Sequence, residues 1–321
     1  TNSMLWQAVS PPEDSKVQEL VDQLNVPREV AYLLAQRGIT TFDQAKEYFR
    51  PEWSQLHSPF LMQDMQQAVE RIAHAIDRSE AVMAFGDYDV DGTTSVALVT
   101  SYLQNHLEVV VPYIPDRYKE GYGISKAGID EAKAQGISLI IALDCGIKAH
   151  EQVAYANELG IDFIICDHHL PDATLPQAVA VLDPKRADCE YPYKELCGCG
   201  IGFKLIQALQ QHFGLEVADL NVYLDLVATA IAADIVPMTG ENRLLSALGI
   251  ERIRQAPRAG FQFFLSTLKK PVRVSDLVFV IAPRINAAGR MNQGISAVEL
   301  LLTKSQEEAL PLARSIEFFN T

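Results

Sequence analysis

The chain is poor in cysteine and in positive charge, and it lacks several common catalytic motifs. Its five cysteines show no paired Cys-x-x-Cys spacing, so we expect a cytoplasmic protein without structural zinc. Polar residues interrupt every apolar run before it reaches membrane-spanning length. Lys and Arg number 27 against 41 Asp and Glu, a net charge of −14, which offers no overall basic surface for nucleic acid. Neither a Gly-x-Ser-x-Gly elbow nor a Walker loop occurs, which argues against a hydrolase triad and a P-loop enzyme.

What the chain does contain is a cluster of acidic residues. Asp87, Asp89 and Asp91 stand at alternate positions directly after an apolar run at 81–85. Carboxylates this close repel one another and stay ionised only beside a divalent metal or hydrogen-bond donors. A calcium loop is excluded, because Leu98 stands where such a loop needs Glu and because a strand precedes the cluster. The alternatives that remain are a metal site and a strand-to-helix turn in which Asp91 caps the helix.

Two later predicted strands also end in ligand-type side chains. The run at 138–143 leads into Asp144, and the run at 161–166 leads into Asp167, His168 and His169. In an open parallel sheet, the ligand site lies in the crevice outside the carboxyl ends of the strands, so these groups can converge. Taken singly, Asp144 can be a helix cap and each histidine an ordinary core or loop residue.

A further acidic residue, Asp234, lies at the end of the apolar run 226–233, where an unpaired carboxylate is costly to bury. Together with the other groups it forms a set of oxygen and imidazole donors that requires no thiolate. Such a set suits two divalent cations, with Mn²⁺ favoured over Mg²⁺ by the histidines. Two metals of this kind can clamp the attacking and leaving oxygens of a phosphoryl centre.

The alternation of apolar runs and helical patterns predicts an α/β fold with a doubly wound, mainly parallel sheet. Strands are expected near 80–87, 109–114, 138–143, 161–166 and 178–182. Helices are expected near 93–105, 125–135 and 149–159. The expected domains are a helical N-terminal region (1–75), the α/β core (76–240) and a mainly helical segment (241–321).

In order and spacing, four of these motifs resemble those of the DHH phosphoesterases, and within them the RecJ-type exonucleases. The motifs are Asp87-x-Asp-x-Asp-Gly92, Asp144-Cys-Gly146, Asp167-His-His169 and Ala233-Asp-Ile-Val-Pro237. Segments 115–123 and 282–291 extend the likeness to the RecJ type. The resemblance implies metal ligands at Asp87, Asp89, Asp91, Asp144, His168 and Asp234. It also implies catalytic roles for Asp144, His168 and His169, while Asp167 orients the paired histidines.

Three arginines and an amide are candidates for binding phosphate, because guanidinium groups match phosphate oxygens. They are Arg117, Arg284, Asn286 and Arg290. Family resemblance links Arg117 and Arg284 to the 5′-terminal phosphate, and surface salt bridges are the alternative for all three arginines. Tyr118 and Tyr122 are candidates for stacking on bases, or for simple packing within a loop.

The resemblance implies a metal-dependent exonuclease that degrades single-stranded DNA from the 5′ end to mononucleotides, in DNA repair and recombination. Two alternatives remain: a small-substrate phosphodiesterase, such as an oligoribonuclease or a cyclic-dinucleotide phosphodiesterase, and a non-catalytic nucleic-acid scaffold. RecJ-type enzymes continue into a second (DHHA1) domain and an OB-fold that carry much of the DNA-binding surface. We therefore expect this acidic chain to be an N-terminal fragment that ends at the start of the interdomain helix.

Overall fold

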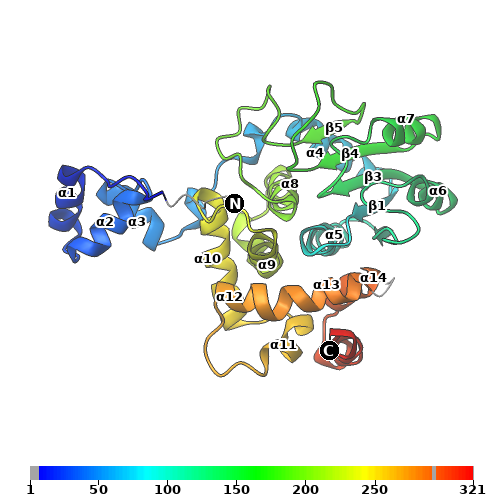
Figure 1. The fold of residues 1–321 in the computed structure, drawn as a ribbon. Helices are drawn as coiled ribbons and strands as arrows, with labels where there is room; N and C mark the ends of the chain where they lie inside the picture. Colours follow the sequence, from blue (N-terminus) through cyan, green and yellow to red (C-terminus); the bar gives the residue numbers. More distant parts are fainter. Residues whose placement is uncertain (1–6, 291–293, 321) are drawn as a thin grey trace, which may run out of the picture. The chain divides into compact units, whose positions relative to one another are not determined.

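The computed structural model describes residues 7–290 and 294–320. It divides into two compact units, Thr1–Leu56 and His57–Thr321 (Figure 1). The domain boundaries expected near residues 75 and 240 stay predictions. None of the helices in the described ranges combines the length and apolar character that crossing a membrane requires.

The first unit is a small helical bundle. Its elements are α1 (Asp14–Leu24), α2 (Arg28–Gln36), α3 (Phe42–Phe49) and the 3-10 turn η1 (Trp53–Gln55). Val17 and Leu20, three residues apart on α1, share one helical face and are fully buried against Ala31 and Leu34 of α2. Thr41 begins α3 as an N-cap, since its hydroxyl accepts a hydrogen bond from the amide of Gln44 (3.2 Å).

The second unit is built on one parallel sheet of five strands with the spatial order β2-β1-β3-β4-β5. The strands are β1 (Ala81–Gly86), β2 (Val110–Tyr113), β3 (Ile137–Leu143), β4 (Asp162–Cys166) and β5 (Ala180–Leu182). Nearly every residue of β1, β3, β4 and β5 is buried, as expected for strands covered on both faces. The predicted α/β class with a parallel sheet is confirmed.

Helices cover both faces of this sheet (Figure 1). They are α4 (Met65–Asp77), α5 (Val90–Leu103), α6 (Lys126–Ala134), α7 (His150–Glu158) and α8 (Gly198–His212), and the short η2 (Pro59–Leu61) contacts α4 and α8. α6 and α7 contact β3 and β4 on one face, while α5 and α8 contact β1, β3 and β4 on the other. The order in which strands are added to the sheet reverses between β1 and β3, because β2 lies on one side of β1 and β3 on the other. Folds of this kind bind ligands at that position.

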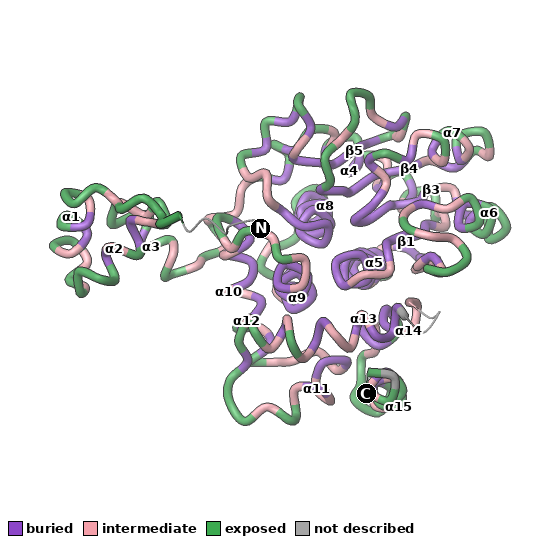
Figure 2. The backbone as a smooth tube through the Cα atoms, in the orientation of Figure 1, coloured by how far each residue is buried: buried purple, intermediate pink, exposed green. Residues whose placement is uncertain are grey.

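Helix α5 is buried on nearly all sides, as are α8 and α9 (Figure 2). Its low amphipathicity follows from its position, because it lies between the sheet and a further layer of helices. The helices of this layer are η3 (Val217–Tyr223), α9 (Leu224–Asp234), α10 (Gly240–Gln255), α11 (Ala259–Leu265), α12 (Val274–Asp276), the π-helix η4 (Leu277–Ile281), α13 (Ala282–Arg290), α14 (Gly294–Leu302) and α15 (Gln306–Asn320).

Candidate metal centre

The predicted ligand residues meet at the carboxyl edge of the sheet. Asp87 follows β1, Asp144 follows β3 and His168 follows β4, while Asp234 ends α9. The amide of Asp144 donates to the carbonyl of Cys166 (2.8 Å), so the ladder between β3 and β4 continues into the site. Because Asp87 and Asp144 follow the two strands that flank the reversal of strand order, the crevice predicted from the sequence lies between them.

The acidic loop after β1 turns tightly into α5. Asp89 is the N-cap of α5, and its carboxylate accepts a hydrogen bond from the amide of Gly92 (2.8 Å). A Cβ at Gly92 would lie 2.4 Å from the carbonyl oxygen of Asp87, so only glycine fits there. Asp87 is fully buried, and neither of its oxygens accepts a hydrogen bond from a described residue. Burial, with help from Asp89, raises the pKa of Asp87 to about 7.

Asp91, in the first turn of α5, is held by the start of another helix. Its two carboxylate oxygens accept hydrogen bonds from the backbone amides of Gly198 and Cys199, each at 2.7 Å. The free amides at the N-terminus of α8 therefore stabilise an anion that the protein itself supplies. Burial nevertheless raises the pKa of Asp91 to about 6, and the neighbouring carboxylates of Asp234 and Asp89 add to that effect.

Asp144 occupies the most constrained position of the centre. Its backbone is left-handed (φ 60°), a region that Asp and Asn tolerate better than most residues. A Cβ at Gly198 would lie 2.5 Å from the Asp144 Cβ, so glycine is required where α8 approaches. Oδ1 of Asp144 is buried and lies 3.1 Å from Nε2 of His168, and within the described chain it accepts no hydrogen bond. Burial, followed by the charges of Asp91 and Asp89, raises the pKa of this carboxyl well above its usual range.

His168 lies among three of the carboxylates. Its Nε2 is 3.1 Å from an oxygen of Asp144 and 3.7 Å from oxygens of Asp91 and Asp234. Burial lowers the pKa of His168, which favours the neutral imidazole that a metal requires. The ligand atoms form two overlapping groups that can each hold a cation: Asp144, His168 and His169, and Asp91, His168 and Asp234.

Asp167 belongs to neither of these two groups, and its carboxylate contacts the histidine pair instead. Its Oδ1 lies 2.6 Å from Nδ1 of His169 and accepts the amide of His168 (2.8 Å), while Oδ2 accepts the amide of Ile147 (2.9 Å). Burial alone would raise the pKa of Asp167, but these hydrogen bonds, led by that from His169, hold it below its usual range. The bond to Asp167 engages Nδ1 of His169 and raises the pKa of its imidazole.

The donor set fits a divalent cation. Among the residues that the structure describes, none of the five carboxylates Asp87, Asp89, Asp91, Asp144 and Asp234 forms an ion pair with Lys or Arg. Within the described residues, both oxygens of Asp87 and Oδ1 of Asp144 are buried and accept no hydrogen bond, which is costly unless a ligand satisfies them. Oxygen and imidazole donors without thiolate suit Mn²⁺ or Mg²⁺. The individual ligand and catalytic roles stay predictions.

The predicted phosphate-binding residues are placed differently from one another. Arg117 is exposed, with its guanidinium carbon 5.1 Å from the ring centre of Tyr88 in the acidic loop. Asn286 is half-buried on α13, and the side chain of Arg290 lies outside the described part of the chain. Arg117 is therefore near the centre with a guanidinium that forms no ion pair in the described structure.

Arg284 is already engaged within the protein. Two of its nitrogens donate to the carboxylate of Glu317 on α15 (2.7 and 2.9 Å), and a third donates to the carbonyl of Val280 (2.8 Å). Its guanidinium also lies 5.4 Å from the ring centre of Phe264. In this structure Arg284 forms a salt bridge, which was the alternative to phosphate binding. Its predicted contact with phosphate would therefore require release from Glu317.

A pocket of about 640 Å³ opens beside the histidine pair. Its lining includes Tyr122, Gly146, Lys148, His168, His169 and Lys185. Tyr122 is well exposed and contacts Tyr88 edge to face, with 6.3 Å between ring centres. Tyr118 is 69% exposed and does not line this pocket. Base stacking by the two tyrosines stays a prediction. Of the two, Tyr122 is the one that lines the pocket beside the centre.

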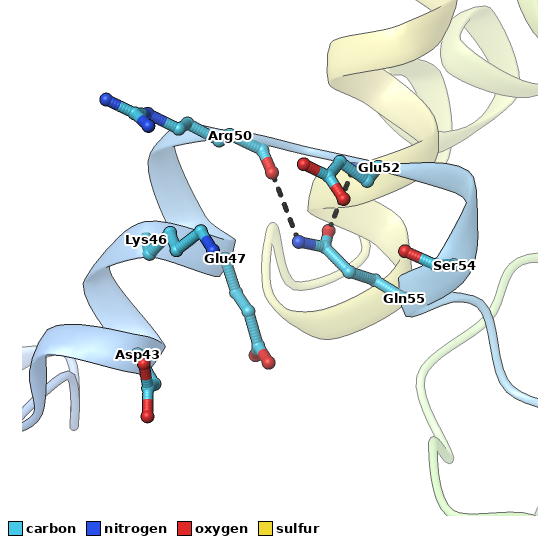
Figure 3. A pocket seen from close by; sticks show the side chains of 7 residues that line it. All are labelled: Asp43, Lys46, Glu47, Arg50, Glu52, Ser54 and Gln55. Carbon is cyan, nitrogen blue, oxygen red and sulfur yellow. Dashed lines mark hydrogen bonds between the residues drawn. The ribbon is translucent and has the colours of Figure 1, made fainter.

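The first unit has a pocket of another kind, about 380 Å³ in volume (Figure 3). Its lining is polar and mostly exposed: Asp43, Lys46, Glu47, Arg50, Glu52, Ser54 and Gln55. Gln55 donates to the carbonyl of Arg50 and accepts from the amide of Glu52, each at 3.1 Å. This pocket has neither histidine nor a buried carboxylate in its lining, so it offers nothing comparable to the centre at the sheet edge.

Two parts of the site escaped the sequence analysis. The first amides of α8, from Gly198 and Cys199, donate to Asp91, a contact that no sequence motif indicated. Asp183 and Lys185 follow β5, and Lys185 lines the pocket. The signal for this second part was present, because polar residues directly follow the predicted strand 178–182 just as they follow the other strands.

Comparisons with known proteins agree with this geometry. Residues 81–231 match the DHH family, N-terminal domain. The single-stranded-DNA-specific exonuclease RecJ of Bacillus subtilis (strain 168) is 39% identical over 322 residues, covering 99% of this chain and 40% of that protein. A crystal structure of exonuclease RecJ bound to manganese gives a TM-score of 0.75 at 31% identity, covering 84% of this chain and 67% of that one. RecJ from Thermus thermophilus in complex with Mn²⁺ gives a TM-score of 0.83 at 28% identity, covering 98% of this chain and 45% of that one.

The chain therefore belongs to the DHH family and, within it, to the RecJ group. The resemblance seen in the sequence motifs is confirmed. The chain spans about half the length of the curated relatives that it matches.

Proposed function

We propose that this chain is the catalytic portion of a metal-dependent exonuclease that hydrolyses single-stranded DNA from its 5′ end and releases 5′-mononucleotides. The observation that supports this most is the convergence of carboxylates at the sheet edge, where no described lysine or arginine pairs with them. The proposal includes two divalent cations, Mn²⁺ or Mg²⁺, and a role in DNA repair and recombination. The five cysteines of the chain are all free, which supports a cytoplasmic location.

Asp91, His168 and Asp234 would hold one cation, and Asp144 would contribute to a second, with Asp87 and Asp89 beside them. When bound, such a pair supplies Lewis-acid activation of water and of the scissile phosphate. The N-terminus of α8 keeps Asp91 ionised and oriented.

His169 is proposed to handle the proton of the reaction. Asp167 holds its Nδ1, so Nε2 is the nitrogen available to the substrate, and the raised pKa of His169 favours the protonated ring. A protonated Nε2 beside the cleaved bond can donate to the departing 3′ oxygen. Arg117, exposed beside the acidic loop, is the guanidinium available for a phosphate of the strand.

Release of mononucleotides from a 5′-phosphorylated single strand in Mn²⁺ tests the proposal. The chain and its Asp144→Asn variant are compared on this strand, on the matching duplex and on a dinucleotide. Cleavage of the single strand that is lost in Asp144→Asn is the expected result. Cleavage of the dinucleotide alone would favour a small-substrate phosphodiesterase, and Mn²⁺ binding without cleavage of either substrate would favour a scaffold.

A further inference from the structure

The turn after β5 contains a lysine that lines the pocket beside the metal centre and forms no ion pair with a described residue. Lys185 is half-buried and lines the same pocket as His168 and His169. Within the described residues, its ammonium forms no ion pair or hydrogen bond. An ammonium that lines a pocket without a counter-charge attracts an anionic ligand.

The backbone around Lys185 is firmly held. Asp183 is fully buried, and its Oδ1 accepts the amide of Lys185 (2.8 Å). The buried guanidinium of Arg186 donates to Asp64 (2.6 Å), to the carbonyl of Val181 (2.7 Å) and twice to Asp188. Pro184, between Asp183 and Lys185, restricts the backbone of the turn further. These neighbours anchor the chain on both sides of Lys185, so its side chain extends from a rigid base.

The charge of Lys185 acts on the centre itself. The pKa of His168 is lowered mainly by burial, and Lys185 contributes in the same direction. The pKa of Asp234 is raised to about 6 by burial and by Asp89, and Lys185 opposes that rise. The ammonium is therefore close enough to influence both ligand candidates, although no carboxylate lies within ion-pair distance of it.

The second lysine of the pocket provides a natural contrast. Lys148 lies 3.4 Å from a carboxylate oxygen of Asp172, and its side chain is 59% exposed. Its charge is thus already paired at the surface, where such pairs contribute little. Lys185 is the pocket lysine whose charge remains available.

We propose that Lys185 is a catalytic residue that donates to a non-bridging oxygen of the phosphate being cleaved. This inference rests on the proposed nuclease function and adds a residue to it. A lysine ammonium is a compact charge with three donors, suited to an oxygen whose negative charge grows during attack on phosphorus. The rigid turn places that charge before the substrate arrives, so little reorganisation is needed.

The first experiment compares Lys185→Met, Lys185→Arg and the control Lys148→Met on a 5′-phosphorylated single strand. Removal of one preorganised donor to a developing charge lowers catalysis on the order of 100-fold, so we expect that loss in kcat/KM for Lys185→Met. Lys185→Arg should recover part of it, and Lys148→Met should change kcat/KM less than about threefold. Mn²⁺ affinity, measured by titration, should stay near that of the unaltered chain. Unchanged kcat/KM in Lys185→Met would overturn the proposal.

A binding experiment separates a failure of this inference from a failure of the nuclease function. Strand affinity is measured over a salt series with Ca²⁺ in place of Mn²⁺. Loss of one phosphate contact reduces the slope of log affinity against log salt by about 0.7 for a single strand. We expect this reduction in Lys185→Met, equal for strands with a 5′ phosphate and a 5′ hydroxyl. An unchanged slope would overturn the contact, and a reduction confined to the 5′-phosphorylated strand would assign Lys185 to the terminal phosphate instead.

Discussion

Helix α8 joins two groups of buried charge that differ in one respect. At its N-terminus the amides of Gly198 and Cys199 hold the carboxylate of Asp91, and no described lysine or arginine pairs with that carboxylate. In the middle of the helix, Lys204 is fully buried and lies 2.6 Å from Glu241. The first group is an excess of negative charge, whereas the second is a neutral pair.

The Lys204 group satisfies its charges within the protein. Its ammonium also donates to the carbonyl of His57 (2.9 Å) and to Gln207 (2.8 Å), and the hydroxyl of Tyr191 donates to Glu241. A buried ion pair with all its hydrogen bonds made needs nothing from outside. The carboxylates at the sheet edge lack such partners, so they need a cation from solution. Burial of charge alone therefore does not mark a functional site; an unmet need for a counter-charge does.

The largest expected effect follows from Asp144→Asn in the unsatisfied group. Asparagine tolerates the left-handed backbone of this position and removes one charge. We expect Mn²⁺-dependent cleavage to fall about 1000-fold, while metal-free stability stays equal or rises because repulsion among carboxylates is reduced. Cleavage rates and urea unfolding measure the two quantities. Wild-type Mn²⁺ affinity in this variant would contradict the assignment.

The satisfied group should respond in the opposite way. Glu241→Ala leaves the ammonium of Lys204 buried without its partner, so we expect a loss of about 3 kcal/mol in the free energy of unfolding. The matched control is the double variant Lys204→Met with Glu241→Leu, which should recover most of that loss. Urea unfolding in EDTA measures both. A loss below about 1 kcal/mol for Glu241→Ala would break the distinction between the two groups.

Metal binding should stabilise the fold through the first group alone. At a Mn²⁺ concentration of about 100 times its Kd, we expect a gain of about 2.7 kcal/mol in unfolding free energy. The gain should persist in the Lys204→Met, Glu241→Leu variant and disappear in Asp144→Asn. Thermal unfolding at increasing Mn²⁺ concentrations measures it, and an equal gain in Asp144→Asn would locate the cation elsewhere.

The two groups also predict the effect of pH. The pKa values of Asp87, Asp91 and Asp234 are raised to about 7, 6 and 6, chiefly by burial, so the folded state binds more protons than the unfolded state. Without metal, their contribution to stability is present below about pH 4 and is lost as pH rises through about 6 to 7. Mn²⁺ affinity should rise over the same interval, because the ligands must ionise. The variant Asp87→Asn isolates the contribution of one group, and its metal-free stability should fall less steeply with pH than that of the unaltered chain. An equal or steeper fall in this variant would contradict the prediction.

The smallest effect concerns Arg284, whose charge is also met internally. Glu317→Ala should cost about 1 kcal/mol or less, since both side chains are partly exposed. If internal pairing marks a structural role, the affinity for a 5′-phosphorylated strand should change less than about threefold. Fluorescence anisotropy measures it, with Glu307→Ala, on the same helix, as the control. A tenfold gain in affinity would show that Glu317 competes with phosphate for Arg284, as the sequence-based assignment requires.

Much of the fold was predictable because its signals are local. Apolar runs bounded by breakers predicted all five strands to within about three residues, and their alternation with helical patterns predicted parallel pairing. The convergence of Asp87, Asp144 and His168 also followed, since the carboxyl ends of parallel strands share one edge. Contacts that join distant segments were not predictable in this way. The capture of Asp91 by the start of α8 joins residues more than 100 positions apart.

The sequence by itself determined which groups are candidates for the chemistry and which strands deliver them, because spacing and strand ends are properties of a local stretch of chain. Tertiary structure alone decided which charges are satisfied. Arg284 meets Glu317 and Lys204 meets Glu241, whereas Lys185 and the carboxylates of the metal centre meet no opposite charge within the described chain. The physical reason is that the cost of a buried charge depends on its neighbours in space, and these neighbours come from helices that only the completed fold brings together.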